Sequence, residues 1–117
     1  MEQIQWLKCG GGVWCELNKV DPSHKNLKGL KGVYIVWNEQ PEKIVVRIGY
    51  GSISDELTHL RKDTAVQAFS KFPLFVTWAD AEEFNMKHIC SYLTESLSPK
   101  VSAGNTGSQK LAVNMPW

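Results

Sequence analysis

The chain of 117 residues is long enough for one compact domain and short for two. Its residues are 43% hydrophobic and include five Trp, three Tyr and four Phe, which excludes the disordered, collagen-like and low-complexity classes. Thirteen Lys and Arg nearly balance twelve Asp and Glu, so the net charge of +1 does not draw the whole molecule to nucleic acid or anionic lipid. Any phosphate binding must therefore come from a local cluster of cations.

Targeting segments and cysteine usage suggest the compartment. The first twenty residues have neither the basic head nor the apolar run of a signal peptide, and no stretch approaches the roughly 20 apolar residues of a membrane span. We therefore expect a soluble, cytoplasmic protein with no membrane contact. Cys9, Cys15 and Cys90 form no even framework, and the first two lack the C-x-x-C spacing of a zinc or redox pair. We expect three reduced, partly buried thiols.

Residues 1–31 are expected to form a short strand and a loop that pack on the main domain. Three glycines precede residues 13–17, where apolar side chains alternate with polar or small ones, as in a half-buried strand. Residues 18–31 have loop chemistry, with Asp-Pro-Ser, one glycine and scattered lysines. Leu27 and Leu30 should pack beneath this loop.

Two runs predict an antiparallel β-hairpin. Residues 32–37 and 43–49 are both rich in β-branched and aromatic side chains. The polar connection 38–42 contains Pro41, which cannot continue the ladder of a central strand.

The pattern after the hairpin predicts a helix and then a strand. Ile53, Leu57 and Leu60 recur at helical spacing up to about residue 62. Residues 72–78 predict a strand, with Pro73 at its beginning or at an edge.

A longer helix should follow directly. Asp80 and Glu83 form a D-x-x-E signature of a helix N-terminus, and Pro99 ends the helix. Its apolar face is expected to comprise Ala81, Phe84, His88, Ile89, Tyr92, Leu93 and Leu97.

The C-terminal segment, residues 100–117, combines a flexible composition with an apolar end. Residues 100–110 are mostly Ser, Ala, Gly, Asn, Thr and Gln, whereas residues 111–117 read LAVNMPW. This end is expected to dock back on the domain; the alternative is docking on a neighbouring subunit or another partner.

Three short motifs mark residues 32–99. Gly32-Val33-Tyr34 opens the first hairpin strand, Arg47-Ile48-Gly49 ends the second, and Arg61 lies in the last turn of the first helix. In this order they resemble the GIY-YIG endonuclease domain, which has Gly-Ile-Tyr, Tyr-Ile-Gly and a helical arginine at these places. With the element order, the resemblance implies an α+β fold: a small antiparallel sheet of three central strands plus a short N-terminal strand, flanked by two or three helices.

The resemblance also implies phosphodiester chemistry. Tyr34 would act as general base or position a water, with Arg47, His59 and Arg61 completing the catalytic group. The two arginines would grip phosphate oxygens and help a phenol of ordinary pKa about 10 to lose its proton. Each of these residues also has a purely structural explanation. Tyr34 could be a packed aromatic side chain and Arg47 a surface cation. Arg61 could cap the helix C-terminus, and His59 could be structural.

Phosphate binding is expected from Gly49, Gly51 and Lys62. Gly49-Tyr50-Gly51 enters a helix and could turn backbone N–H groups toward an anion. Simple turn geometry explains the two glycines equally well.

Two departures from the family pattern bear on activity. Arg47 replaces the tyrosine of the second motif, and Cys90 occupies the position of the glutamate that binds the metal. Mg²⁺ or Mn²⁺, the cofactor of an active enzyme of this kind, prefers hard oxygen ligands, so a thiol is no plain substitute. At helical spacing from Met86, Leu93 and Leu97, Cys90 is expected to face the sheet.

Other carboxylates of the chain could in principle bind the metal ion. Glu83 lies about 10 Å along the helix from position 90, and Glu95 points elsewhere around it. Glu16 and Glu56 belong to other elements, whose approach the sequence does not give.

Three functional hypotheses remain. The first is a protein that binds DNA or another phosphate-rich ligand with weak or absent cleavage. The second is an active metal-dependent nuclease that recruits a different carboxylate. The third is an inactive interaction or self-association module, with a homodimer formed through the apolar C-terminal tail or exposed aromatic side chains.

Overall fold

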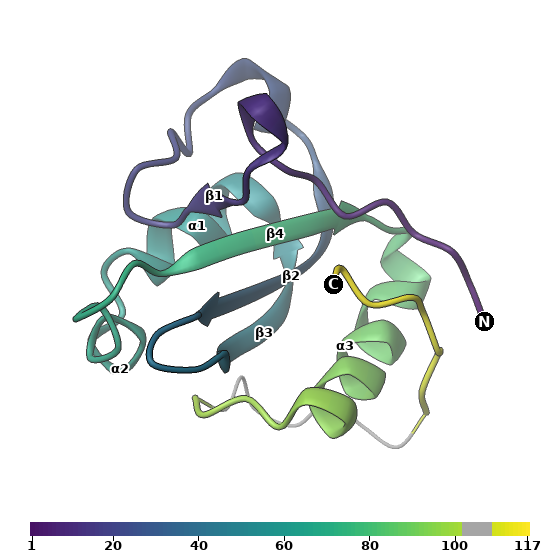
Figure 1. The fold of residues 1–117 in the computed structure, drawn as a ribbon. Helices are drawn as coiled ribbons and strands as arrows, with labels where there is room; N and C mark the ends of the chain where they lie inside the picture. Colours follow the sequence, from purple (N-terminus) through teal and green to yellow (C-terminus); the bar gives the residue numbers. More distant parts are fainter. Residues whose placement is uncertain (102–108) are drawn as a thin grey trace.

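The computed structural model describes residues 1–101 and 109–117. One sheet contains four antiparallel strands in the order β1-β4-β2-β3: β1 (Cys15–Glu16), β2 (Lys31–Asn38), β3 (Ile44–Ser52) and β4 (Phe75–Asp80) (Figure 1). The helices are α1 (Ile53–Leu60), α2 (Thr64–Gln67) and α3 (Glu83–Leu97), with two 3-10 turns, η1 (Gly10–Gly12) and η2 (Lys25–Leu27). This arrangement confirms the predicted α+β class. Within the described ranges no helix has the length and apolar character needed to cross a bilayer.

The predicted hairpin is confirmed as β2 and β3, which pair antiparallel with Tyr34 opposite Gly49. β2 also pairs with β4, so it lies inside the sheet, and its residues from Gly32 onward are buried. Gly32 is required there, because a Cβ at this position would lie 2.9 Å from the carbonyl carbon of Ala79 in β4. The glycine of the first motif therefore permits close approach of two backbones.

The sheet separates two hydrophobic clusters. Successive side chains of a strand point to opposite faces, so Tyr34 and Val36 pack with α1, whereas Val33, Ile35 and Trp37 pack with α3. Each helix thus covers its own face of β2.

The helical pattern is confirmed for α1 and corrected for α3. Ile53, Leu57 and Leu60 are buried as expected. The N-cap of α3 is Glu82 and not Asp80, because Asp80 still belongs to β4.

The expected apolar face of α3 is confirmed at Ile89, Tyr92, Leu93 and Leu97, which lie in the hydrophobic cluster, and is wrong at Phe84. Its buried side consists of Met86, Ile89, Cys90, Ser91 and Leu93. Phe84 is 80% exposed, since it precedes Met86 by two residues and so points about 200° around the helix from it.

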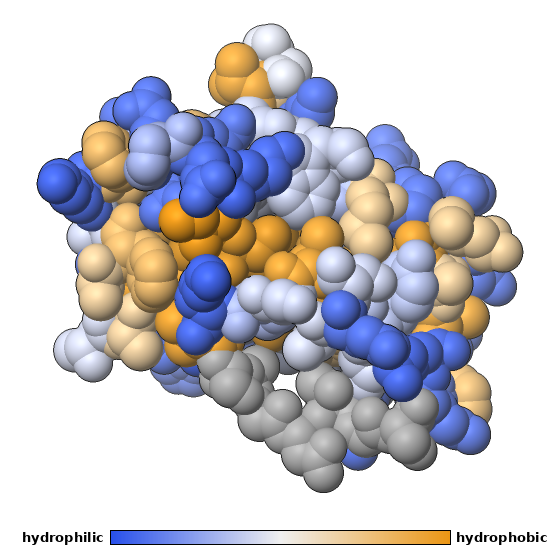
Figure 2. Space-filling view, turned by 60° about the horizontal axis from the view of Figure 1, so that its bottom comes forward, coloured by the Kyte–Doolittle hydropathy of each residue, from blue (hydrophilic) through white to orange (hydrophobic). Residues whose placement is uncertain are grey.

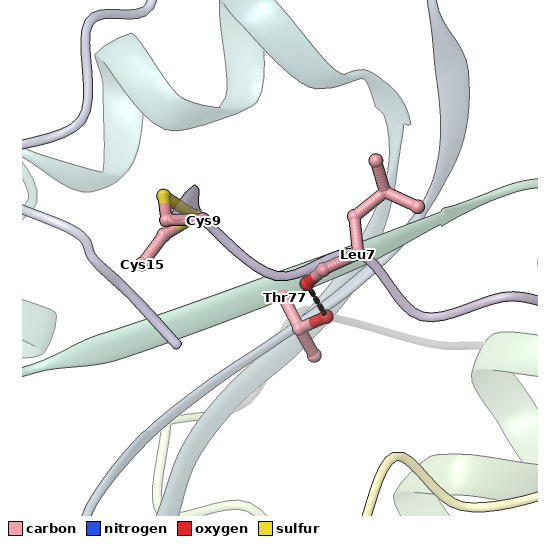
Figure 3. Close-up of a disulfide and its surroundings, with 4 residues drawn as sticks. All are labelled: Leu7, Cys9, Cys15 and Thr77. Carbon is pink, nitrogen blue, oxygen red and sulfur yellow. Dashed lines mark hydrogen bonds between the residues drawn. A yellow bond between two sulfur atoms is a disulfide. The ribbon is translucent and has the colours of Figure 1, made fainter. Parts of the chain in front are cut away.

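Cys9 and Cys15 form a disulfide, so the expectation of three reduced thiols is wrong for this pair (Figure 3). Gly11 and Gly12 have φ values of 75° and 73°, which L side chains rarely adopt, and the resulting turn brings the two cysteine Cα atoms to 5.0 Å. Cys90 is free and buried. The predicted strand at residues 13–17 shortens to β1, which pairs with β4.

The loop of residues 18–31 packs as predicted. Leu27 is buried and Leu30 contacts the cluster on the α1 face. The Ile53 N–H donates to the Leu30 carbonyl at 3.0 Å, which joins the end of the loop to the start of α1.

The apolar C-terminal end docks back on its own domain, as predicted. Val113 is fully buried and forms a parallel bridge with Glu2, so the N-terminal segment pairs with the C-terminal segment a few residues before the chain ends. The Trp117 ring packs against Trp37 at a centroid distance of 5.3 Å. The flexible stretch predicted at residues 100–110 falls mainly on residues 102–108, outside the described residues.

Candidate functional site

Tyr34 lies across Gly49, its partner in the β2–β3 ladder. Only 1% of Tyr34 is exposed, and a Cβ on Gly49 would fall 2.6 Å from the Tyr34 Cζ atom. The glycine of the second motif therefore makes room for the tyrosine of the first. This close packing supplies a structural reason for both residues, and the predicted phosphate contact of Gly49 stays a prediction.

The Tyr34 hydroxyl is held in its protonated form. Burial raises the pKa of Tyr34 far above its ordinary value, Glu56 of α1 raises it further, and Arg47 acts in the opposite direction. A tyrosine that serves as general base must lose its proton near neutral pH. Here the environment favours a phenol that donates a hydrogen bond.

Arg47 is bound to Asp63, which the sequence did not indicate as part of the site. The Arg47 Nη1 and Asp63 Oδ2 atoms lie 3.1 Å apart, with 22% and 31% of the two side chains exposed. The other oxygen of Asp63 accepts from the N–H groups of Ala65 and Val66 and so caps α2. An Asp ahead of Thr-Ala is an N-cap signal, which could have placed the residue. The pairing means that Arg47 does not present a free charge to a phosphate.

Glu56 is the second polar residue beside Tyr34. The sequence placed it on a helix but gave no orientation. In the structure Glu56 raises the pKa of the Tyr34 hydroxyl. Its side chain also lies beside Gly51, where an added Cβ would be 3.7 Å from the Glu56 Cδ atom. Gly51 has a φ of 138°, so its backbone conformation itself favours glycine.

Arg61 joins the loop of residues 18–31 to the end of α1 by hydrogen bonds. Its Nη1 donates to the Val20 carbonyl at 2.6 Å and its Nη2 to the Asn18 carbonyl at 3.1 Å. Hydrogen bonds from Ser23 hold the pKa of Asp21 below its usual value, with smaller contributions from nearby charges that include Arg61. The structure thus places Arg61 with the loop, apart from the Arg47–Asp63 pair.

His59 and Lys62 are exposed at the same end of α1. The structure therefore divides the predicted site residues. Tyr34, Arg47 and Gly49 come together with Glu56 and Asp63, whereas His59, Arg61 and Lys62 lie at the surface with the loop.

Cys90 lies on the other side of the sheet from Tyr34. It is fully buried in the cluster with Val33 and Ile35, as the predicted sheet-facing position requires, and burial raises the pKa of its thiol. The Tyr34 side chain leaves β2 on the α1 side of the sheet, whereas Cys90 packs against the α3 side.

The carboxylates considered from the sequence do not form a metal site among the described residues. Within residues 1–101 and 109–117, no three His, Cys, Asp or Glu side chains gather in an arrangement that could hold a metal ion. Three carboxylates weighed from the sequence pair with lysines instead: Glu16 with Lys19, Glu83 with Lys31, and Glu95 with Lys110.

The chain matches no protein-family model, no curated protein and no solved structure. The resemblance to the GIY-YIG domain therefore rests on the motifs and on the order of elements alone.

Proposed function

We propose that this protein binds a phosphate-rich ligand such as DNA and does not cleave it. The observation that carries the proposal is the division of the site. The tyrosine and arginine of the two motifs are sequestered in the fold, while other cations gather at the surface.

Cleavage would require a general base, a free phosphate-binding arginine and a metal ligand, and none of the three candidate residues is suited to its role. The candidate base Tyr34 is buried and its pKa is raised, and Arg47 is neutralised by Asp63. The position of the family's metal ligand holds a buried thiol on the opposite face. A hydrolytic mechanism would need all three groups to meet one scissile phosphate.

The phosphate groups would bind at the end of α1, at a basic surface that we define by Lys19, His59, Arg61 and Lys62. The two bonds from Arg61 to the carbonyls of Asn18 and Val20 bring Lys19, which lies between them, to the end of α1. Lys19 pairs with Glu16, but its side chain is 79% exposed, so this pair is weak and exchangeable. Lys62 takes part in no ion pair with any described residue.

Fluorescence anisotropy with a labelled DNA duplex and a labelled single strand tests this binding at low and moderate salt. We expect affinity to fall with rising salt concentration, as phosphate contacts require. The double variant Lys19→Gln and Lys62→Gln should lower both affinity and salt slope, by about 0.7–0.9 in slope per lost contact. Lys87→Gln, an exposed lysine of α3, serves as the matched control. Absence of binding at low salt, or an equal loss in the control, would overturn the proposal.

A second candidate function, protein interaction, is favoured by exposed apolar surface. Figure 2 shows hydrophobic residues near the centre of one face, with hydrophilic residues above them. On α3, Phe84 is 80% exposed and contacts the ring of His88. Self-association through this aromatic pair predicts a concentration-dependent sedimentation coefficient that Phe84→Ser abolishes. A monomer at all concentrations excludes the homodimer.

A further inference from the structure

A pocket of about 310 Å³ lies between the N-terminal segment, the loop of residues 18–31 and β4. Its volume falls at the lower end of the range for small-molecule sites, about 300–1,000 Å³. The walls are mainly apolar and include Leu7, Leu27, Leu30, Trp78 and the Cys9–Cys15 disulfide. None of the residues of the basic surface lines it.

Two hydrogen-bond donors belong to residues that line this pocket. The Trp78 indole N–H is buried and meets no acceptor among the described residues. The Nδ1 atom of His24 accepts from the Asn26 N–H at 3.1 Å, so the neutral ring carries its proton on Nε2 and offers it as a donor. The indole N–H is closed off from the pocket interior, whereas His24 is exposed, so the His24 donor is the one that a ligand oxygen can reach.

The charged groups at the pocket argue for a neutral ligand. Asp21 lines the pocket, and hydrogen bonds from Ser23 favour its ionised form by lowering its pKa. Lys8, also a lining residue, places its ammonium over the Trp14 ring at 4.6 Å. The two lining residues carry opposite charges, so the pocket has no net charge to attract an ion, and an ion would lose hydration on entering its apolar part.

The N-terminal wall is held in place by several bonds (Figure 3). The Leu7 N–H donates to the Trp78 carbonyl at 2.9 Å, and the Thr77 hydroxyl donates to the Leu7 carbonyl at 2.7 Å. The disulfide then joins Cys9 to Cys15, which pairs with Val76 in β4. The pocket is therefore pre-formed, which lowers the entropic cost of binding.

We propose that this pocket binds a small, uncharged, mainly apolar molecule that carries one carbonyl oxygen. The apolar part contacts Leu27, Leu30 and the disulfide. The carbonyl oxygen accepts from the Nε2 donor of His24, and the opposite charges of Lys8 and Asp21 give a charged ligand no net attraction. The disulfide is part of the wall, so its reduction weakens binding.

Three probes of similar size separate these features: benzamide, benzoate and toluene. Each is titrated into the full-length, oxidised, ¹⁵N-labelled protein, and the indole N–H resonance of Trp78 is followed after assignment with Trp78→Phe. We expect saturable shifts with benzamide, and at least tenfold weaker binding of benzoate and of toluene. His24→Ala, a change at an exposed residue, should weaken benzamide and leave toluene unchanged, and reduction with dithiothreitol should weaken benzamide at least tenfold.

The proposal fails if benzamide produces no saturable shift. It also fails if toluene binds as tightly as benzamide, since the carbonyl would then have no role, or if benzoate binds more tightly than benzamide. If the reduced protein binds benzamide as tightly as the oxidised protein does, the disulfide is not part of the binding site and the proposal as stated is wrong. DNA binding measured on the same samples reports separately on the basic surface, so failure of one proposal is distinct from failure of the other.

Discussion

The two faces of the sheet have opposite chemistry, although they share the central strand. The α1 face brings Tyr34, Arg47, Glu56 and Asp63 together, so charges and a phenol lie within or at the edge of a packed cluster. The α3 face surrounds Cys90 with aliphatic side chains and contains no charge among its buried members. A single residue step along β2 decides which of these environments a side chain enters.

A polar motif therefore need not be an active site. A polar group inside a protein requires partners, and on the α1 face Arg47 pairs with Asp63 through Nη1, although its buried Nε has no hydrogen-bond partner among the described residues. On the α3 face the free thiol of Cys90 is fully buried among apolar side chains, away from the solvent and oxygen donors that a hard metal ion requires. The predictions below probe each face in turn.

The largest effect is expected from Cys90→Glu. A carboxylate at this fully buried position should cost about 3 kcal/mol or more at pH 7, whereas Cys90→Ala should cost about 1 kcal/mol. Burial raises the pKa of the new carboxyl, so its penalty should shrink as the pH falls to about 4, where the unfolded carboxyl is protonated too. Urea unfolding at the two pH values measures this. A Glu variant as stable as wild type would mean that position 90 reaches water.

Gly49→Ala probes the other face. The added methyl would overlap the Tyr34 ring, so we expect a loss of about 2–3 kcal/mol in the free energy of unfolding. Gly10→Ala is the matched control, since a Cβ there meets no atom within 4 Å, and it should change stability by about 0.5 kcal/mol at most. Similar losses in both variants would contradict the packing of Tyr34 on Gly49.

Alkaline pH should reveal the buried thiol. The folded pKa of Cys90 is raised by burial above the unfolded value of about 8.5, so the neutral thiol favours the folded state. This contribution is fully present below about pH 8.5 and is lost as the pH rises through the folded pKa, with a limiting slope of about 1.4 kcal/mol per pH unit. Unfolding curves between pH 7 and 10 should therefore diverge from those of Cys90→Ala. Parallel curves would show an accessible, ordinary thiol.

The smallest effect is expected at the ion pair of the α1 face. Asp63→Asn keeps an amide oxygen able to cap α2 but removes the charge beside Arg47, so a loss of about 1 kcal/mol is expected. Lys19→Met breaks an exposed pair and should cost less than about 0.5 kcal/mol. Thermal unfolding of both variants gives the comparison, and a larger loss in Lys19→Met would reverse it.

The sequence predicted the secondary structure well because its signals are local. Alternating and β-branched residues marked β2 and β3, and helical spacing marked α1. Phe84 was misplaced because a single helix has several candidate apolar stripes, and only packing against the sheet selects one. The Cys9–Cys15 bond was missed because its spacing is unusual, and the turn that closes it depends on the left-handed conformations of Gly11 and Gly12.

The candidate site was only half predictable. The positions of Tyr34 and Gly49 on neighbouring strands followed from the hairpin, but the partners of Arg47 and Arg61 did not. Asp63 and the carbonyls of residues 18 and 20 reach these arginines through tertiary folding, across sequence separations of 16 to 43 residues. The resemblance supplied roles for the motif residues, whereas their burial and pairing depend on the whole fold.

We propose that this protein binds phosphate-rich ligands and does not cleave them. The most direct measurement incubates supercoiled plasmid and branched DNA with the protein and Mg²⁺ or Mn²⁺, and records binding and strand breakage on the same samples, beside Tyr34→Phe and Cys90→Glu. We predict salt-sensitive binding and intact DNA throughout, with no cleavage gained in Cys90→Glu, because position 90 lies on the opposite face from Tyr34. Nicking by the parent protein that disappears in Tyr34→Phe would contradict the account.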